Sequence, residues 1–525
     1  MAMGRQGPRQ AEMFLSWDEL PRSPGHVFWD RLGQVLQDTG FDAFVEELCR
    51  PCYAAVMGAP SLPPGGYFRM HMIGYFEGLP SERGIAWRCA DSFSLREFLG
   101  LGASGQVPDH SWLSRTRARL PLEVHDAVFA WVIERLAERG LIKGRRIGID
   151  ASTMEANAAM RSIRRRDTGE SYRQMLKRMA QESGVATPTA ADLKQMDRRR
   201  KGKRTSNEDW ASPTDPDTKI TRLKDGRTRL AYKPEHAVDL DTGAVVAAGI
   251  HPADQGDTTT LAGTLEAAAR GLEAAGARPS AERPAELVAD KGYHSRAVVT
   301  ELAGSPWRTR IAEPKARGDG VSRWSRWRGD RAAQRAVYNN RARLRSGVGR
   351  EAMRLRAEKV ERSFAHTLDG GGLRRTFLRG RENVHKRYLI HVAAFNLGLV
   401  MRLLLGAGTP RLLTSRVGII FWLIAPDAGL VVVLLLFPDP ATGDTLPNRD
   451  SSLAPTPLPP PRSPSPLLQQ PVNCARAVWT CQRPSLVGPS STVRERSFIR
   501  DLWNVQMYRR VRIGPTLFKG GDGRR

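Results

Sequence analysis

Three acidic residues, far apart in the sequence, each stand where a side chain could do chemistry. Asp150 ends the β-branched run 145–153, and Asp290 ends a second strand-like run. Glu361 lies in a segment with helical spacing, 354–366. Because carboxylate oxygens are the ligands that magnesium and manganese prefer, two acids at strand ends and one on a helix could converge on such an ion. Two ions held in this way can bind both the attacking and the leaving oxygen of a phosphodiester.

Each of these acids taken alone has a plainer interpretation. An aspartate at the end of a strand is more often a turn residue or a helix cap than a catalytic group. It is therefore the combination of the three acids, in elements that could bring them together, that favours catalysis.

The elements around the three acids alternate between strands and helices. A hairpin is predicted across 236–251, with its turn at 241–243, and a helix is predicted over 260–275. A further strand at 310–312 and an apolar core helix at 388–405 complete the pattern. We therefore predict an α/β fold in which helices cover the faces of a mixed sheet.

The chain is strongly basic. It has 81 Lys and Arg residues against 55 Asp and Glu residues, a formal net charge of +26 over 525 residues. Such an excess favours a polyanionic partner, because cationic side chains release counterions from nucleic acid. An arginine-rich composition can also reflect a GC-rich genome.

The cysteines and the N-terminus are consistent with a reducing compartment and indicate little more about location. Cys49 and Cys52 form a CxxC pair with no second pair at zinc spacing, so a structural or incidental role is favoured over metal binding. The N-terminus is polar and lacks the pattern of a signal peptide, which fits a cytoplasmic protein.

The first 140 residues have mainly helical patterning. A capping box at 94–97 predicts one short helix, and Pro108 and Asp109 precede a second helix over 111–120. A helix-turn-helix that binds DNA and an ordinary bundle with a solvated basic face are both open for this pair. The second helix carries three arginines, namely Arg115, Arg117 and Arg119.

Two basic segments interrupt the folded pattern. Residues 154–232 form a polar, basic insertion that we expect to be a loop or a mobile helical arm that orders on DNA. Residues 308–350 are dominated by arginine, with Trp324 and Trp327 between the cations. This interleaving suits distorted or single-stranded DNA, whose bases can stack on indole rings, and it suits a solvated linker with two packing tryptophans equally well.

Three further residues lie in the motif blocks and could contact DNA: Lys233, His236 and Tyr293. For His236, a hydrogen-bonded structural histidine is the favoured interpretation.

The character of the chain changes toward its C-terminal end. The apolar stretch 417–437 is interrupted by Pro426 and Asp427, so each arm is too short to span a bilayer. Residues 449–489 are rich in proline and serine and are expected to be disordered. We predict that the tail 409–525 is dispensable for catalysis; an oligomerisation or membrane-associating segment is the alternative.

Several blocks, taken in order, resemble the DDE transposases of bacterial insertion sequences. The blocks of the catalytic part are Gly-Ile-Asp-Ala-Ser-Thr at 148–153, Val-Ala-Asp-Lys-Gly-Tyr at 288–293, Val-Glu-Arg-Ser-Phe at 360–364 and the stretch 379–396. The segments 81–83 and 98–101 match the N-terminal domain of these transposases. The resemblance covers roughly residues 60 to 405, and the ordered set is far more specific than any one block.

The resemblance is incomplete around Glu361. Many relatives carry a tyrosine and an arginine shortly before this glutamate and a lysine about two helical turns after it. This chain has Arg354, Ala357 and Leu368 at the corresponding positions, so the DNA contacts of those positions are not carried over.

The resemblance implies a domain organisation and a catalytic site. It implies an N-terminal helical DNA-binding domain at 1–140 and a ribonuclease-H-like catalytic core at 141–408 that contains the basic insertion, followed by the low-complexity tail. Asp150, Asp290 and Glu361 would be both the catalytic residues and the ligands of two Mg²⁺ or Mn²⁺ ions.

The implied function is DNA transposition: cleavage at each transposon end, followed by transfer of the new 3′-hydroxyl into target DNA. The implied partner is double-stranded DNA, bound by a homodimer in the bacterial cytoplasm at the nucleoid, without stable membrane association. A nuclease of the same fold that only hydrolyses DNA and an inactive DNA-binding remnant are the alternatives. The residues expected to contact DNA are Arg115, Arg117, Arg119, Lys291, Tyr293 and Arg381.

Overall fold

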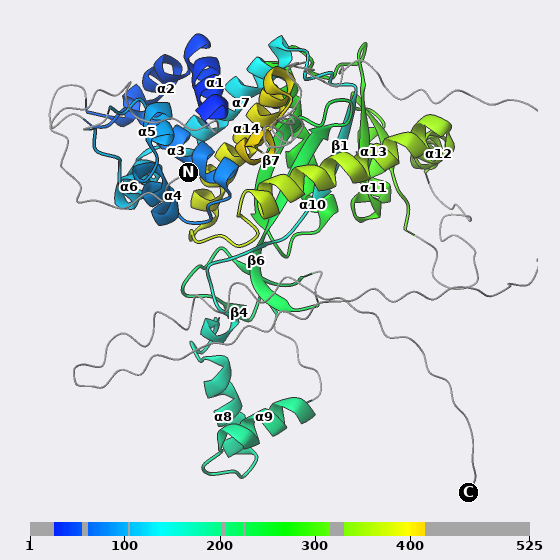
Figure 1. Cartoon of the computed structure of the whole chain (residues 1–525). Coiled ribbons are helices and arrows are strands. Elements are labelled where there is room, and N and C mark those ends of the chain that lie inside the picture. The colour runs from blue at the N-terminus through cyan, green and yellow to red at the C-terminus, as the bar shows by residue number, and fades with distance from the viewer. Residues whose placement is uncertain are drawn as a thin grey trace, which may run out of the picture. The chain divides into compact units, whose positions relative to one another are not determined.

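The computed structural model describes most of the chain before residue 415 (Figure 1). All of the described residues belong to one unit, Met1–Pro438. Trp324, Trp327 and the stretches 417–437 and 449–489 lie outside the described residues, and so do the predictions made for them. The described ranges are 26–54, 61–102, 105–200, 206–223, 226–314 and 330–414.

The N-terminal part is helical, as its sequence pattern predicts. Its helices are α1 (His26–Asp38), α2 (Phe41–Cys49), the 3₁₀ turn η2 (Arg50–Cys52), α3 (Pro64–Glu77), α4 (Glu82–Ala90), α5 (Phe93–Phe98), α6 (His110–Arg119) and α7 (Leu122–Glu138). Aromatic side chains fill the space between them; for example, Phe28, Trp29 and Phe76 pack edge to face.

One predicted helix start is confirmed and another is wrong. Asp109 caps α6, because its side chain accepts a hydrogen bond from the Trp112 backbone N at 2.8 Å. The capping box predicted at 94–97 does not form. Helix α5 begins two residues earlier, after Ser92, and Ser94 lies inside it with its hydroxyl 3.1 Å from that of Ser92.

Seven strands of the described chain form one mixed sheet, as predicted. In space five of them follow the order β7-β6-β1-β8-β9; β2 and β5 pair with β6 as well. Strand β6 runs antiparallel to both β1 and β7, whereas β8 runs parallel to β1, and β9 runs parallel to β8. The strands are β1 (Arg146–Ala151), β2 (Met154–Glu155), β5 (Lys219–Arg222), β6 (Thr228–Asp239), β7 (Val245–Pro252), β8 (Ala285–Ala289) and β9 (Trp307–Ile311).

Helices cover both faces of this sheet. Successive side chains of a strand point to opposite faces, so Glu235 and His236 of β6 mark the two sides. Glu235 accepts a hydrogen bond from Thr264 of α10 (Asp257–Ala274). His236 is hydrogen-bonded to Ser363 of α13 (Gly347–Phe364). Helices α10 and α13 therefore lie on opposite faces of the sheet.

His236 has the structural role that was predicted for it. Its ring is buried, with Nδ1 2.8 Å from the Ser363 hydroxyl and Nε2 2.6 Å from the Tyr388 hydroxyl. The ring also stacks on Phe364, with the two centroids 4.2 Å apart. These contacts attach the end of α13 to the sheet.

The remaining elements complete the second half of the fold. They are the 3₁₀ turn η4 (Lys291–Tyr293), α11 (Arg296–Leu302), α12 (Arg331–Arg345), the π-helical turn η5 (Ala365–Gly370) and α14 (Arg381–Leu405). Helix α14 packs against α7, α3 and β7. Asn396 of α14 satisfies both backbone groups of Val245, at 3.0 and 2.8 Å. The helical part and the sheet thus share a continuous buried core.

The apolar composition of α14 is explained by this burial. The helical stretch Arg381–Thr414 is long and apolar enough to cross a bilayer, but 67% of its apolar window is buried inside the protein. A helix that is apolar on all sides is also typical of a protein core.

The basic insertion contains a folded pair of helices. Helices α8 (Tyr172–Glu182) and α9 (Ala190–Arg199) pack against each other beside the two-stranded sheet of β3 (Arg164–Arg165) and β4 (Trp210–Ala211) (Figure 1). Both helices start with a capping box, at Ser171 and Thr189. Of the two predicted alternatives, a loop or a helical arm, residues 172–199 have the helical form. The two ends of the predicted insertion belong instead to the main sheet, because β2, β5 and the start of β6 lie within 154–232.

Candidate active site

Asp150 and Asp290 stand at the same edge of the sheet. Strands β1 and β8 are parallel, and Ile149 pairs with Ala289. Asp150 and Asp290 are therefore the next residues of two adjacent strands, whose spacing is about 4.8 Å. The sheet brings together two acids that are 140 residues apart in the sequence.

The turn after Asp290 requires a glycine. The Asp290 side chain accepts a hydrogen bond from the Gly292 backbone N at 2.8 Å and caps η4. A Cβ atom at position 292 would collide with Oδ2 of Asp257 and would lie 3.1 Å from Oδ1 of Asp290. Glycine lets the turn approach Asp257 this closely without displacing the Asp257 carboxylate.

Glu361 lies on α13, which packs against β1. Gly148 makes this possible, because a Cβ there would lie 3.1 Å from Val360 of α13 and would overlap Leu240. Glu361 and Asp150 line the same cavity, which has a volume of about 470 Å³. The other lining residues are Ala151, Ser152, Thr153, Glu155, Leu223, Phe364, Ala365, Asp369 and Arg374.

Arg356 neutralises Asp150 from inside the protein. Its Nη2 atom lies 2.7 Å from Oδ2 of Asp150, and its Nε donates to the Ile149 carbonyl at 3.4 Å. The sequence prediction missed Arg356, although a signal was present. Ala352, Arg356 and Val360 are four residues apart on one buried face of α13. A cation in an apolar stripe requires a buried anion as its partner.

A second cation, Arg374, lies at the wall of the same cavity. It donates to the Ser152 hydroxyl at 3.2 Å and to the Thr153 carbonyl at 3.4 Å, and it pairs with Asp369 at 2.7 Å. Arg374 was also missed, because Ser152 and Thr153, which it contacts at the cavity, lie more than 200 residues away in the sequence. A guanidinium at the mouth of an acidic cavity can contact a phosphate that enters it.

The three acids fit a hard divalent cation in the type of ligand that they supply. All three supply carboxylate oxygens, two from adjacent strand ends and one from the cavity that Asp150 lines. Within the described residues, however, no three His, Cys, Asp or Glu side chains stand close enough together to hold a metal ion. Arg356 binds Oδ2 of Asp150, so a metal that used this oxygen would have to displace the guanidinium.

Two of the residues expected to contact DNA are inside the protein. Arg117 is 6% exposed and pairs with Glu82, and Tyr293 is 0% exposed and donates a hydrogen bond to Glu235. Neither side chain is available to a DNA backbone in this structure. The other four expected contacts are exposed, namely Arg115 and Arg119 on α6, Lys291 in η4 and Arg381 at the start of α14.

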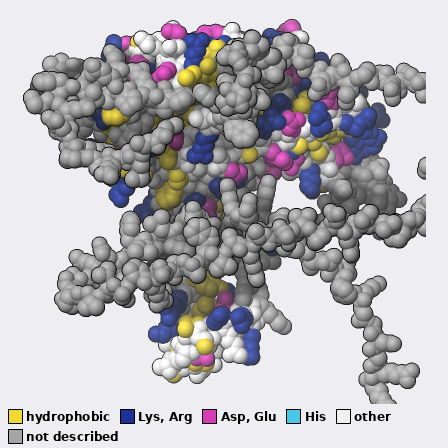
Figure 2. Space-filling model, in the orientation of Figure 1, with side chains coloured by type: hydrophobic (Ala, Val, Ile, Leu, Met, Phe, Trp, Pro, Cys, Tyr) yellow, Lys and Arg dark blue, Asp and Glu magenta, His cyan; other side chains and the backbone are white. Residues whose placement is uncertain are grey.

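Cations are spread over the visible surface of the protein. Figure 2 shows Lys and Arg side chains on the α8 and α9 pair and around α12. On α12, Arg331, Arg335 and Arg345 are exposed. The basic composition is therefore displayed at the surface, where it can attract a polyanion.

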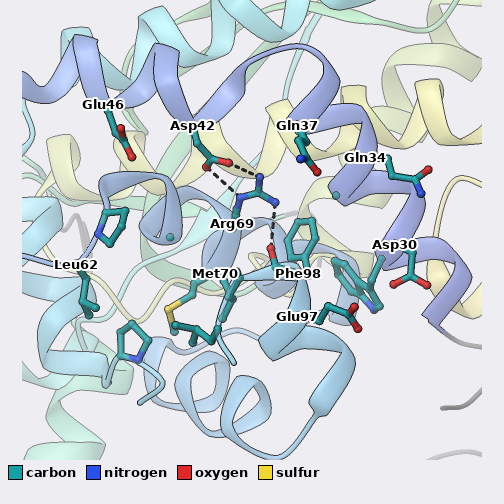
Figure 3. Close-up of a pocket in the computed structure, with 18 of the residues that line it drawn as sticks. Asp30, Gln34, Gln37, Asp42, Glu46, Leu62, Arg69, Met70, Glu97 and Phe98 are labelled. Atoms are coloured by element: carbon teal, nitrogen blue, oxygen red, sulfur yellow. Dashed lines mark hydrogen bonds and ion pairs between the residues drawn. The ribbon is translucent and has the colours of Figure 1, made fainter. Parts of the chain in front are cut away.

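A larger cavity, of about 870 Å³, lies among the N-terminal helices (Figure 3). Arg69 at its wall bonds Asp42 at 2.6 and 3.2 Å and the Phe98 carbonyl at 3.0 Å. None of the three candidate catalytic acids lines this cavity. Its wall carries four acids, which disfavours a DNA phosphate there: Asp30, Asp42, Glu46 and Glu97.

The chain matches two family models. One, described as Transposase domain (DUF772), covers residues 16–119, and the other, described as Transposase DDE domain, covers residues 192–397. These matches define a transposase. The chain belongs to the DDE transposases of insertion sequences. No curated protein and no solved structure matches it.

The two matches bear differently on the candidate residues. The first includes α6 with Arg115 and Arg119, and the second includes Asp290 and Glu361. The second match begins after Asp150, so the assignment of this residue rests on its motif and on its position beside Asp290.

Proposed function

We propose that this transposase cleaves DNA at the ends of its element and joins the new 3′-hydroxyl to target DNA, in both steps with a divalent metal. The observation that carries the proposal is the placement of Asp150 and Asp290 at adjacent ends of parallel strands, with Glu361 in the cavity that Asp150 lines. Such a set of carboxylates suits phosphodiester chemistry.

The catalytic core is proposed to be ribonuclease-H-like and to span residues 141–408. Three antiparallel strands followed by two strands parallel to β1, in the order β7-β6-β1-β8-β9, support this assignment. Residues 1–140 are proposed as the DNA-binding domain, 154–232 as the basic insertion of the core and 409–525 as a tail.

Asp150, Asp290 and Glu361 would hold Mg²⁺ or Mn²⁺. Bound metal would activate the attacking water or hydroxyl and stabilise the leaving oxygen. The protein's own contribution is positional: the sheet fixes two carboxylates, and His236 and Phe364 attach the helix that carries the third. Arg374, held by Asp369 and Ser152, can orient the phosphate at the mouth of the cavity.

The partner is proposed to be double-stranded DNA, namely the ends of the element and the target, bound by a homodimer in the bacterial cytoplasm. The net charge of +26 and the exposed Arg115, Arg119, Lys291 and Arg381 support this. A protein that neutralises several phosphates binds DNA with a steep dependence on salt.

A strand-transfer assay tests the proposal against its two rivals. Pre-cleaved element ends with free 3′-hydroxyls are incubated with a target plasmid, Mg²⁺ and the full chain. We expect joined products that depend on metal. A nuclease without strand transfer would cleave uncut ends but join nothing, and an inactive remnant would bind the ends without cleaving them. Either result would contradict the proposal.

A further inference from the structure

A fourth acid, Glu235, lies next to the candidate site but is completely buried. It is 0% exposed and sits on β6, where it pairs across the sheet with Ala151, the neighbour of Asp150. A buried carboxylate is costly unless it is surrounded by hydrogen-bond donors. The cost of burying Glu235 must therefore be offset by hydrogen-bond donors from elements other than β6.

The carboxylate of Glu235 joins three different elements. Both Thr260 and Thr264 of α10 donate hydroxyl hydrogen bonds to it, the first at 3.1 Å. Tyr293 donates its hydroxyl from the turn that follows β8. His251 of β7 lies close as well, with Nε2 3.3 Å from Oε2. Each oxygen of Glu235 thus has at least two polar partners.

The charges in this cluster fix the direction of the hydrogen bonds. Burial raises the pKa of Glu235, but the neighbouring His251, Thr264 and Tyr293 and the charge of Lys233 bring it below the ordinary value of a glutamate. Burial and the charge of Glu235 raise the pKa of Tyr293. The glutamate is therefore ionised at neutral pH. The tyrosine hydroxyl stays protonated and donates a hydrogen bond to it.

Tyr293 is mechanically linked to Asp290. The two residues are the ends of one 3₁₀ turn, in which the Tyr293 backbone N donates to the Asp290 carbonyl at 3.3 Å. Within that turn Gly292 donates to the Asp290 carboxylate at 2.8 Å. Fixing the tyrosine ring therefore fixes the orientation of the Asp290 side chain.

The other side of the turn is held by a second pair. Lys233 lies 2.7 Å from Asp257 and also donates to Gln255 O at 3.2 Å and to the Thr260 hydroxyl at 3.1 Å. Asp257 packs directly against Gly292. The turn thus lies between Asp257 on one side and the Tyr293 to Glu235 hydrogen bond on the other.

We propose that Glu235 and Tyr293 are positioning residues that hold Asp290 in line with Asp150. Glu235 lies on β6, the strand beside β1, and through Tyr293 it fixes the turn that follows β8. One buried carboxylate therefore fixes the position of Asp290 relative to Asp150. This inference rests on the proposed function, because Asp290 matters here as a metal ligand.

The test replaces Tyr293 with Phe in the full chain. This change removes one hydroxyl and keeps the buried ring. The matched control is Tyr67→Phe, because Tyr67 is also fully buried and bonds one partner, His125 Nε2 at 3.1 Å, among the N-terminal helices. Both variants should lose similar thermal stability, so stability alone does not separate them.

Two measurements on the DNA-free protein do separate them. Hydrogen exchange of the Gly292 and Tyr293 amides should accelerate about fivefold in Tyr293→Phe, as the loss of one buried hydrogen bond predicts. The dissociation constant for Mn²⁺, measured by electron paramagnetic resonance, should rise roughly tenfold, as is typical when a partner of a metal ligand is removed. Tyr67→Phe should change neither quantity.

A second variant, Glu235→Gln, tests the other end of the link. The amide keeps the size of the side chain but places a donor among donors, so the same two changes are expected. Exchange and Mn²⁺ binding in Tyr293→Phe that match those of Tyr67→Phe would overturn the positioning role. If the wild type binds no Mn²⁺ but exchange is accelerated in Tyr293→Phe, the link between Tyr293 and the turn is supported. The absence of Mn²⁺ binding would then count against the proposed function instead.

Discussion

Asp150 is paired with a cation of its own chain, and this residue-scale feature bears directly on metal binding. Arg356 lies 2.7 Å from one oxygen of Asp150, and both side chains are largely shielded from solvent, at 10% and 24% exposure. Solvent screens such a pair less than a surface ion pair. A metal that binds this oxygen would compete with the guanidinium for it.

Replacing Arg356 with Gln should therefore increase the response of the protein to metal. We expect the metal-free variant to lose roughly 1–3 kcal/mol of stability, because Asp150 loses a charged partner. Addition of Mg²⁺ should then raise its melting temperature more than that of the wild type, since binding to the folded state stabilises it. Arg354→Gln is the control, because Arg354 is exposed and pairs with Glu358, at 3.8 Å, away from Asp150. Equal metal-induced shifts in all three proteins would contradict the competition.

Single residues also show where sequence reasoning reaches its limit. Asp150 and Asp290 could be predicted, because each ends a short apolar run and the end of a strand is visible locally. The burial of Arg117 could have been suspected from its place four residues after the buried Leu113. Its partner Glu82 could not, because the two are 35 residues apart and meet only through the packing of α4 on α6.

At the scale of elements, helix α6 presents two of its three predicted arginines to solvent. Arg115→Ala together with Arg119→Ala should weaken DNA binding and lower the slope of log K against log salt by about 2, since each phosphate contact contributes about 0.9. Arg117→Ala should instead destabilise the protein, because it leaves Glu82 without its buried partner. Binding isotherms at several salt concentrations and urea unfolding measure the two effects. A double variant with an unchanged slope would move DNA recognition away from α6.

The regular elements of the core could be read from local pattern. The hairpin predicted across 236–251 is β6 and β7, the helix predicted over 260–275 is α10, and the strand at 310–312 belongs to β9. The helices of the insertion were harder to predict, because the composition of this segment is polar. Its two helices bury only a few apolar residues, such as Met175 and Leu193, and depend on caps at Ser171 and Thr189.

At the scale of the whole molecule, the N-terminal helices and the sheet are tied together by α14. Arg387 of this helix is fully buried and donates to the carbonyls of Leu79 and Pro80 after α3, at 2.9 and 2.8 Å. The sequence predicted an apolar helix at 388–405 but not what it would pack against, because nothing local connects position 387 to position 79. Substitutions in the N-terminal helices that contact α14 should therefore also affect the sheet, and the reverse.

Buried histidines make the molecule sensitive to acid. Burial lowers the pKa of His125 to about 4 and that of His236 to about 3, against about 6.5 in an unfolded chain. The unfolded chain therefore binds more protons between these values, so stability is complete above pH 6.5 and falls as the pH drops below it. At pH 5 each of these histidines should cost about 2 kcal/mol.

Urea unfolding at pH 7.5 and pH 5.0 measures this loss. His125→Gln should be less stable than the wild type at pH 7.5, because Tyr67 loses its partner, yet its loss between the two pH values should be smaller by about 2 kcal/mol. The exposed His110→Gln should keep the loss of the wild type. A His125→Gln variant with the full loss would show that this histidine does not carry the acid sensitivity.

Asp150, Asp290 and Glu361 are proposed to form one catalytic site. The most direct test of this proposal is Mg²⁺-dependent cleavage of DNA carrying the ends of the element, by the wild type and by Asp150→Asn, Asp290→Asn and Glu361→Gln. Each variant should lose roughly 10³-fold or more in cleavage rate, about 4 kcal/mol of transition-state stabilisation, while it still binds the ends. Glu358→Gln, an exposed change one turn from Glu361, should cleave at the normal rate. Near-normal cleavage by any of the three variants would remove that residue from the site, and near-normal cleavage by all three would contradict the account.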